Sequence, residues 1–212
     1  MNQTILVTIT GPSLTGKSKL AQLLKPFGFE ELISTTTRPP RQGEINGVHY
    51  NFVDVSTFKA MVENNLMIEN VQVGKNYYGV SKIAFDNVIN KGKNGVIIVE
   101  PNGAQQVAKY CKKNNICLHQ VFIDNPLNVL VERFLKRYKN DELAKDDVYA
   151  IRIIDMLKKE PKDWVEPAYN GTHHYDQIFT TFNPENEKDV VNQIIDAIDK
   201  KLTKKINFKR KL

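Results

Sequence analysis

Residues 4–18 read TILVTITGPSLTGKS, an apolar run followed by a glycine-rich turn. The first part, Thr4 to Ile9, is rich in β-branched residues and stops at Gly11-Pro12, which predicts a buried strand. The turn, residues 11–18, matches the pattern G-x-x-x-x-G-K-[ST]. Apolar residues at helical spacing follow from Lys17 to Lys25, so a helix begins where the turn ends. A turn in this context cradles the phosphates of a nucleotide.

Each residue type in this turn has a chemical reason. Glycines let the backbone wrap closely, so that successive N–H groups and the helix N-terminus face the phosphates. Lys17 would reach the β- and γ-phosphates, and the Ser18 hydroxyl would ligate Mg²⁺. A chance glycine-rich turn is the alternative, but it needs neither the strand before it nor the helix after it. We therefore predict that ATP with Mg²⁺ binds through Gly11, Pro12, Ser13, Leu14, Thr15, Gly16, Lys17 and Ser18.

The rest of the chain alternates between strand and helix patterns. Strands are expected at 29–33, 95–100, 116–123 and 176–181, and helices at 81–90, 104–113, 126–138, 146–159 and from 190 onward. This alternation predicts a parallel, doubly wound α/β sheet. A different pattern fills the region before residue 81: a strand near 48–53, a helix near 57–65 capped by Ser56, and two strands around 71–78. The chain has no internal repeats or low-complexity linkers, so we predict one domain over residues 1–212.

Composition excludes several classes of protein. Hydrophobic residues make up 41% of the chain and charged residues 25%, which is ordinary for a soluble globular protein and not for a disordered or collagen-like one. No segment approaches the run of about 18 apolar residues that a membrane span needs, and the first residues lack the basic start of a signal peptide. Cys111 and Cys117 lack metal-ligand spacing, so we interpret them as reduced thiols in a cytoplasmic protein without a membrane partner.

Positive charge is distributed unevenly between the two basic residue types. The 30 Lys and Arg against 24 acidic residues give a net charge of +6. Only six of the 30 are Arg: 38, 41, 133, 137, 152 and 210. Arg supplies a planar, forked cation that Lys cannot replace, so we expect these few to stand where that geometry matters. The basic tail near Lys200 to Lys211 could bind nucleic acid, but we interpret it as a solvated terminus and expect no nucleic-acid partner.

A second motif follows the first helix. Residues 34–50 read STTTRPPRQGEINGVHY, and Glu69 and then Tyr77-Tyr78-Gly79 come after it. Two guanidinium groups, of Arg38 and Arg41, with nearby tyrosine hydroxyls suit a phosphate monoester. This set resembles the guanylate kinase family, whose motifs S-x-T-T-R-x-P-R-x-G-E-x-x-G-x-x-Y, I-E and Y-Y-G recur here with nearly the same spacing. The resemblance covers about residues 4 to 160.

The resemblance implies a fold and an activity. The expected fold is an α/β, P-loop NTPase-type parallel sheet flanked by helices, with an inserted mixed-strand lobe for a nucleoside monophosphate and a helical lid. We expect the core at 1–33, 92–125 and 172–205, the lobe at 34–91, the lid at 126–171 and a basic tail at 206–212. The expected activity is ATP-dependent phosphorylation of GMP or dGMP by a monomer or homodimer.

The resemblance also assigns residues to the acceptor nucleotide: Ser34, Arg38, Arg41, Glu44, Tyr50, Glu69, Tyr78 and Glu100. The arginines and tyrosines would hold its phosphate with support from Glu44, while Ser34 and Glu69 would face the base. One carboxylate can accept from both N1–H and the N2 amino group of guanine, whereas adenine has no proton on N1. The catalytic residues would be Lys17 and three lid arginines, Arg133, Arg137 and Arg152, which spread positive charge over the transferring phosphoryl group.

The chain departs from the family pattern mainly on the base side. The family usually has D-x-D where this chain has Ile98 and Glu100, and Ser or Thr where it has Val80. The region from Glu160 to Gly171 also departs. Two alternatives therefore stay open: a deoxynucleoside monophosphate kinase with relaxed or altered base specificity, and a non-catalytic guanylate-kinase-like interaction module. The second usually has a damaged phosphate-binding loop, and this loop is intact.

Overall fold

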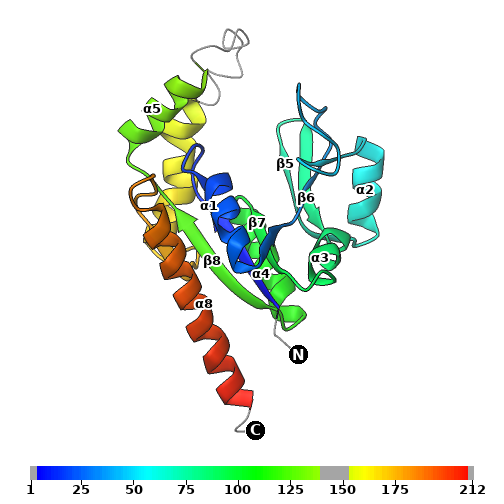
Figure 1. The fold of residues 1–212 in the computed structure, drawn as a ribbon. Helices are drawn as coiled ribbons and strands as arrows, with labels where there is room; N and C mark the ends of the chain where they lie inside the picture. Colours follow the sequence, from blue (N-terminus) through cyan, green and yellow to red (C-terminus); the bar gives the residue numbers. More distant parts are fainter. Residues whose placement is uncertain (1–3, 139–152, 210–212) are drawn as a thin grey trace. The chain divides into compact units, whose positions relative to one another are not determined.

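The computed structural model describes residues 4–138 and 153–209, the side chains of 138 and 204–209 excepted (Figure 1). One sheet has the strand order β2-β7-β1-β8-β9, and its β2–β7 and β8–β9 pairs run parallel. The strands are β1 (Ile5–Thr10), β2 (Phe29–Glu31), β7 (Asn94–Ile98), β8 (Cys117–Ile123) and β9 (Gln177–Phe179). All five lie where strands were expected, and the predicted α/β fold with a parallel sheet is confirmed.

A second, mixed sheet lies within the region expected to form the inserted lobe. Its order is β4-β3-β6-β5, with β3–β4 parallel and the other pairs antiparallel. The strands are β3 (Thr35–Thr36), β4 (Asn51–Phe52), β5 (Met67–Val73) and β6 (Asn76–Ser81). The β5–β6 hairpin confirms the two strands expected around 71–78. The strand expected at 48–53 shrinks to two residues, because residues 45–49 form a turn in which His49 N–H donates to the carbonyl of Ile45.

The helices follow the predicted order, although those expected at 57–65 and 104–113 begin two and three residues earlier than predicted, and one continues beyond its predicted end. They are α1 (Lys17–Leu24), η1 (Lys25–Phe27), α2 (Val55–Glu63), α3 (Lys82–Ile89), α4 (Pro101–Lys113), α5 (Leu127–Tyr138), the π-helical η3 (Asp155–Lys159) and η4 (Pro161–Val165), α7 (Glu166–Tyr169) and α8 (Glu187–Lys209). The helix expected at 146–159 has its start outside the described residues, and helical structure continues beyond 159 to Tyr169.

The prediction that Ser56 caps α2 is wrong. The helix begins at Val55, and Asp54 occupies the N-cap position with its carboxylate accepting from Thr57 N–H at 2.7 Å. The Ser56 hydroxyl itself donates to Asp54, and this bond with the two from Thr57 lowers the pKa of Asp54 to about 2. Asp is as good an N-cap residue as Ser, so a helix start two residues earlier agrees equally well with residue preference.

The chain divides into two compact units. The first comprises Met1–Thr8 and Ala21–His119, and its core is a cluster of buried side chains from β5, β6, β7, α3 and α4. In this unit α4 is tied to β5 by Gln106, whose side-chain amide donates to the carbonyl of Asn70 and accepts from its N–H. Figure 1 shows α2 and α3 beside the β5–β6 hairpin.

The second unit comprises Ile9–Leu20 and Gln120–Leu212. It holds the glycine-rich turn, α5, the helices up to Tyr169, β9 and the long helix α8 (Figure 1). One face of α8 is apolar and buried, at Val190, Val191, Ile194 and Ile198. The predicted loop and the predicted lid region therefore belong to this unit, while the acceptor motif belongs to the other.

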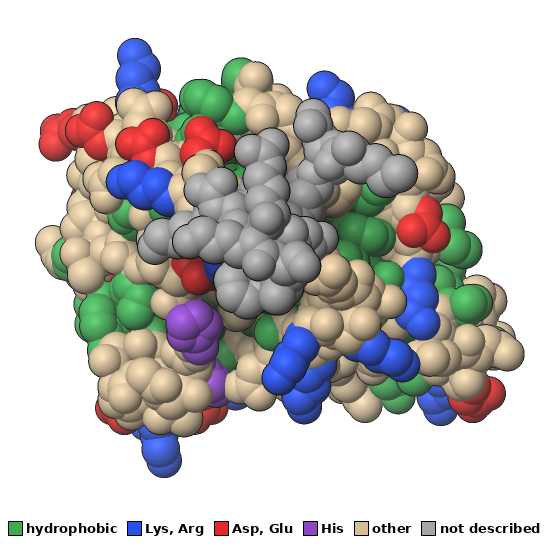
Figure 2. Space-filling model, turned by 90° about the horizontal axis from the view of Figure 1, so that it is seen from below, with side chains coloured by type: hydrophobic (Ala, Val, Ile, Leu, Met, Phe, Trp, Pro, Cys, Tyr) green, Lys and Arg blue, Asp and Glu red, His purple; other side chains and the backbone are tan. Residues whose placement is uncertain are grey.

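The surface bears on the interpretation of the positive charge. On the face in Figure 2, basic side chains are interspersed with acidic and polar ones, and those drawn in colour form no continuous basic patch. On this face the basic side chains drawn in colour lie at the surface among residues of other kinds. Across residues 4–138 and 153–209, no helix is long and apolar enough to cross a membrane.

Candidate nucleotide-binding site

The glycine-rich turn has the backbone shape that its sequence predicts. It joins β1 to α1, and Gly11 and Gly16 have φ values of +148° and +102°, which favour glycine. A Cβ atom on Gly11 would lie 2.0 Å from the carbonyl oxygen of Ile123, and one on Gly16 would lie 2.7 Å from the ring of Phe182. Both positions therefore exclude a side chain, and the strand–turn–helix context is confirmed.

Lys17 lies over the loop. Its Nζ donates to the carbonyl oxygens of Gly11 at 2.8 Å and Pro12 at 2.6 Å. The ammonium is therefore held against the backbone that would surround a phosphate. Ser18, the next residue, is exposed in the first turn of α1, where its hydroxyl is accessible to a ligand.

Two side chains from distant segments hold the loop from outside. Arg133 in α5 donates through Nη1 to the carbonyl of Leu14 at 3.0 Å and through Nη2 to that of Phe182 at 2.7 Å. Asn125 donates to the carbonyl of Thr15 at 3.1 Å and accepts from the N–H of Phe182 at 3.1 Å. Sequence reasoning assigned Arg133 to the phosphoryl group and missed Asn125. Asn125 lies just after β8, at the carboxyl end of a core strand, and this position could have identified it as a residue near the site.

The structure describes one of the other two lid arginines. Arg137 is exposed on α5, one turn after Arg133, as the i, i+4 spacing predicts. Arg152 lies outside the described residues. Their proposed action on the phosphoryl group therefore stays a prediction.

In the other unit, an ion pair organises the acceptor motif. Arg38 Nη2 donates to both carboxylate oxygens of Glu44, at 2.8 and 2.9 Å, and Arg38 Nη1 donates to the carbonyl of Pro39. Glu44 also accepts from the backbone N–H of Arg41 at 2.7 Å. The hydrogen bond between the two side chains raises the pKa of Arg38 and lowers that of Glu44, so both remain charged at neutral pH. Glu44 thus orients the side chain of Arg38 and the backbone of Arg41.

The aromatic residues of the motif gather around Arg38. Its guanidinium carbon is 5.5 Å from the ring centroid of Tyr50, and the Tyr50 and Tyr78 rings meet edge to face at 6.2 Å. Burial, with the neighbouring Tyr78, raises the pKa of the Tyr50 hydroxyl, which therefore stays protonated and can donate. Arg41 is exposed to solvent. Half-buried Ser34 accepts through its backbone carbonyl from Asn51 N–H.

Glu69 in β5 is a buried acid, with only 4% of its surface exposed. Burial raises its pKa to about 7; the charge of Glu100 adds to this increase, and a hydrogen bond from the backbone of Val80 opposes it. Val80 is the cross-strand partner of Glu69, so both side chains project from the same face of the hairpin. Glu100 occupies the N-cap position of α4 without using its carboxylate as a cap. The carboxylate of Glu69 also approaches Gly103, where an added Cβ would lie 2.9 Å from Oε2.

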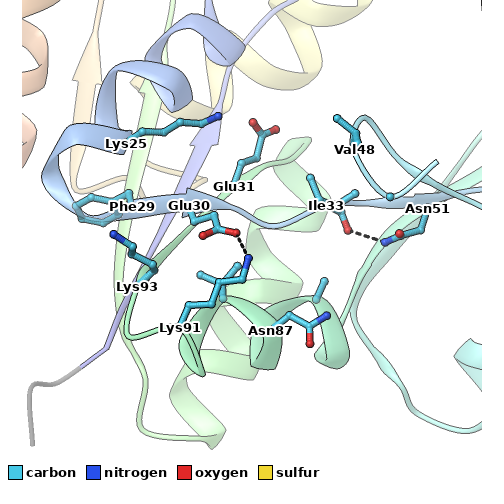
Figure 3. Close-up of a pocket in the computed structure, with 13 residues that line it drawn as sticks. Lys25, Phe29, Glu30, Glu31, Ile33, Val48, Asn51, Asn87, Lys91 and Lys93 are labelled. Atoms are coloured by element: carbon cyan, nitrogen blue, oxygen red, sulfur yellow. Dashed lines mark hydrogen bonds and ion pairs between the residues drawn. The ribbon is translucent and has the colours of Figure 1, made fainter. Parts of the chain in front are cut away.

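A separate open cavity of about 650 Å³ lies in the same unit (Figure 3). Its wall includes Glu31, Lys25 and the ion pair between Lys91 and Glu30. Burial raises the pKa of Glu31, and the charge of Lys25 partly offsets the increase. None of the residues predicted to bind a nucleotide lines this cavity.

Within the described part of the chain, no three His, Cys, Asp or Glu side chains cluster as metal ligands. Cys111 and Cys117 are both buried and form no disulfide with each other.

Comparison with known proteins identifies the family. The family model described as guanylate kinase matches residues 3–159. The chain belongs to the guanylate kinase family. The match includes the glycine-rich turn, the acceptor motif and Glu69, and it ends just before Glu160. The guanylate kinase family is thus matched over the region where the sequence motifs resemble it, and not over the segment that departs from it.

Individual guanylate kinases are similar to this chain in sequence or in fold. The chain is 36% identical to a guanylate kinase of Shewanella denitrificans over 157 residues, which is 73% of this chain and 72% of that protein. It is 41% identical over 105 residues to a guanylate kinase of Shewanella sp. strain MR-7, which is 48% of this chain, and it spans about half (51%) of that relative's length. The crystal structure of guanylate kinase from Anaplasma phagocytophilum has a TM-score of 0.63 and 21% identity, covering 95% of this chain and 88% of that one, and it supports the fold.

Proposed function

We propose that this protein transfers the γ-phosphoryl group of ATP to GMP or dGMP, producing ADP and GDP or dGDP. The single observation that carries the proposal is the intact loop: its two glycines have positive φ, and Lys17 Nζ lies on its backbone. A non-catalytic member of the family would not need this geometry. Guanylate kinases among the relatives support the choice of acceptor.

The reaction is a direct displacement at phosphorus. A phosphate oxygen of the acceptor attacks the γ-phosphorus, the bond from γ-phosphorus to the β,γ-bridging oxygen breaks, and ADP leaves with that electron pair. Lys17 and the N–H groups of the loop bind the donor phosphates. Arg133, Arg137 and Arg152 are proposed to stabilise charge on the transferring group, and in the described geometry Arg133 also secures the loop at Leu14.

The acceptor is held by its phosphate and its base. Arg38 and Arg41, with the hydroxyls of Tyr50 and Tyr78, are proposed to bind the phosphate, and Glu44 keeps Arg38 oriented. Ser34, Glu69 and Glu100 are proposed to face the base. Ionised Glu69 accepts from N1–H and the N2 amino group of guanine, and adenine would leave this buried acid without a partner.

A relaxed base preference is the second candidate, and one observation favours it. Val80 stands directly opposite Glu69, at the position where the family usually supplies a hydroxyl. A valine side chain offers no hydrogen bond to a base, so selection would depend more heavily on the carboxylate.

The residues also fit a divalent cation. Mg²⁺ usually keeps several waters and is held by one or two protein oxygens together with the substrate phosphates. The exposed hydroxyl of Ser18 beside the loop would therefore be a sufficient protein ligand. When bound, the ion would neutralise charge on the β- and γ-phosphates. We propose a cytoplasmic monomer or homodimer, in keeping with two cysteines that are not joined in a disulfide.

A coupled assay for ADP release tests the proposal. We expect turnover with GMP or dGMP and little with AMP, CMP or dTMP, each supplied with ATP and Mg²⁺. Absence of turnover with every acceptor would refute the enzyme proposal. Equal turnover with CMP or dTMP would show that the role assigned to Glu69 is wrong. Comparing Val80→Thr with the natural chain then measures what the missing hydroxyl contributes to the choice of base.

A further inference from the structure

Glu160 makes an unexpected contact with the phosphate-binding loop. Its Oε2 accepts from the backbone N–H of Ser13 at 3.1 Å, and its Oε1 accepts from the Ser13 hydroxyl at 2.7 Å. The two residues are 147 positions apart, and both belong to the second unit. Glu160 is only 5% exposed. A buried carboxylate is costly unless its oxygens find donors, and here a single loop residue supplies two.

The helical segment around Glu160 has an unusual backbone. Glu160 lies at the junction of the two π-helical stretches, η3 and η4, and it caps neither with its side chain. A π-helix closes i to i+5 hydrogen bonds in place of i to i+4, so each turn takes in extra chain and rotates the following side chains. Short π-helical segments occur frequently at functional sites. In this segment the irregular backbone brings an acid onto the loop.

Ser13 also stands next to a strained residue. Leu14 has φ of +67°, a left-handed conformation that is unfavourable for a residue with a side chain. Such a conformation persists only where the surroundings fix it. Glu160 holds the residue before Leu14, Arg133 holds its carbonyl, and Asn125 holds the carbonyl of Thr15. Three successive loop residues are therefore anchored by side chains.

We propose that Glu160 is a positioning residue for ATP: it fixes Ser13, so that the loop is held in the shape in which its remaining N–H groups face the donor phosphates. The proposal rests on the proposed function. Glu160 does not touch the phosphates itself, because two negative groups side by side would repel each other. It acts through Ser13 and ties the helical segment around residue 160, within the predicted lid region, to the loop.

Kinetics with each substrate varied separately test this role. In Glu160→Gln the amide nitrogen cannot accept, so one of the two bonds is lost and KM for ATP should rise about tenfold, since a bond to a charged group is involved. KM for GMP should change less than about twofold. Asp163→Asn is the matched control, because it removes one negative charge from an exposed position of η4. It should leave both KM values unchanged.

Direct titration of ATP with Mg²⁺ in the absence of GMP separates this proposal from the proposed function. Weaker binding by Glu160→Gln than by the natural chain supports the positioning role even if no acceptor is turned over. Ser13→Ala, which removes only a hydroxyl, should weaken binding by a smaller factor and serves if the first variant does not fold. Unchanged ATP binding in either folded variant would overturn the proposal. So would an equal rise in KM for ATP and GMP, which a general loss of structure would cause.

Discussion

The ionisation of Glu69 should control recognition of GMP near neutral pH. Burial raises its pKa to about 7, and guanine is recognised by the carboxylate form. The carboxylate is lost as pH falls through this pKa, so affinity should fall in the same direction. About nine-tenths of Glu69 is ionised at pH 8 and about one-tenth at pH 6. KM for GMP should therefore rise about tenfold between pH 8 and pH 6, while KM for ATP should not follow this curve.

The assay is ADP release at saturating ATP, with GMP varied at each pH. The phosphate of GMP titrates near pH 6 and adds its own pH dependence. Glu69→Gln provides the control because it has no titrating group, so whatever pH dependence remains in it belongs to the substrate. A KM for GMP that is flat between pH 6 and 8 would refute the reasoning, as would an identical profile in Glu69→Gln.

Glu100 gives a second check on the same site. Its negative charge contributes to the raised pKa of Glu69. Glu100→Gln removes that charge, so the midpoint of the pH profile should move to lower pH. A midpoint that stays in place would show that the charge of Glu100 does not reach Glu69.

Other substitutions test the loop, the acceptor motif and the tail. Arg38→Lys loses the fork that binds Glu44, and kcat/KM for GMP should fall about 10- to 100-fold while KM for ATP is unchanged, as steady-state kinetics would reveal. Gly16→Ala places a methyl group against Phe182 at a positive φ, and urea denaturation should show a loss of about 1–3 kcal/mol with a higher KM for ATP. Deleting residues 204–212 should leave the kinase rates unchanged; a large loss would mean that the tail takes part in the reaction.

Local signals predicted most of the framework. The glycines at 11 and 16 and the apolar run before them lie within a few residues, so the strand, turn and helix follow from sequence alone. The resemblance placed Glu44 beside the arginines, and it is only six residues from Arg38. The two-residue strand β3 escaped prediction because it is too short to show an alternating pattern.

Contacts between distant segments were the part that sequence reasoning missed. Asn125 reaches the loop across 110 residues and Glu160 across 147, and neither belongs to a motif that names a partner. The position of Glu160 depends on a π-helical backbone that residue patterns do not reveal. The raised pKa of Glu69 likewise depends on burial created by folding, not on its neighbours in sequence.

Gly103 lies close to the carboxylate of Glu69, so a substitution at Gly103 would affect the group that is proposed to select the base. An added Cβ at Gly103 would meet Oε2 of Glu69 at 2.9 Å, and that oxygen is the movable end of a side chain. A mutation to alanine would therefore displace the carboxylate, and the added Cβ would also press on Val99, whose Cβ would lie 3.2 Å away. In the proposed function, such a variant would recognise guanine less well, because the carboxylate that accepts from the base would be moved. A guanine acceptor would thus require a glycine at a helical position where helix propensity alone favours alanine.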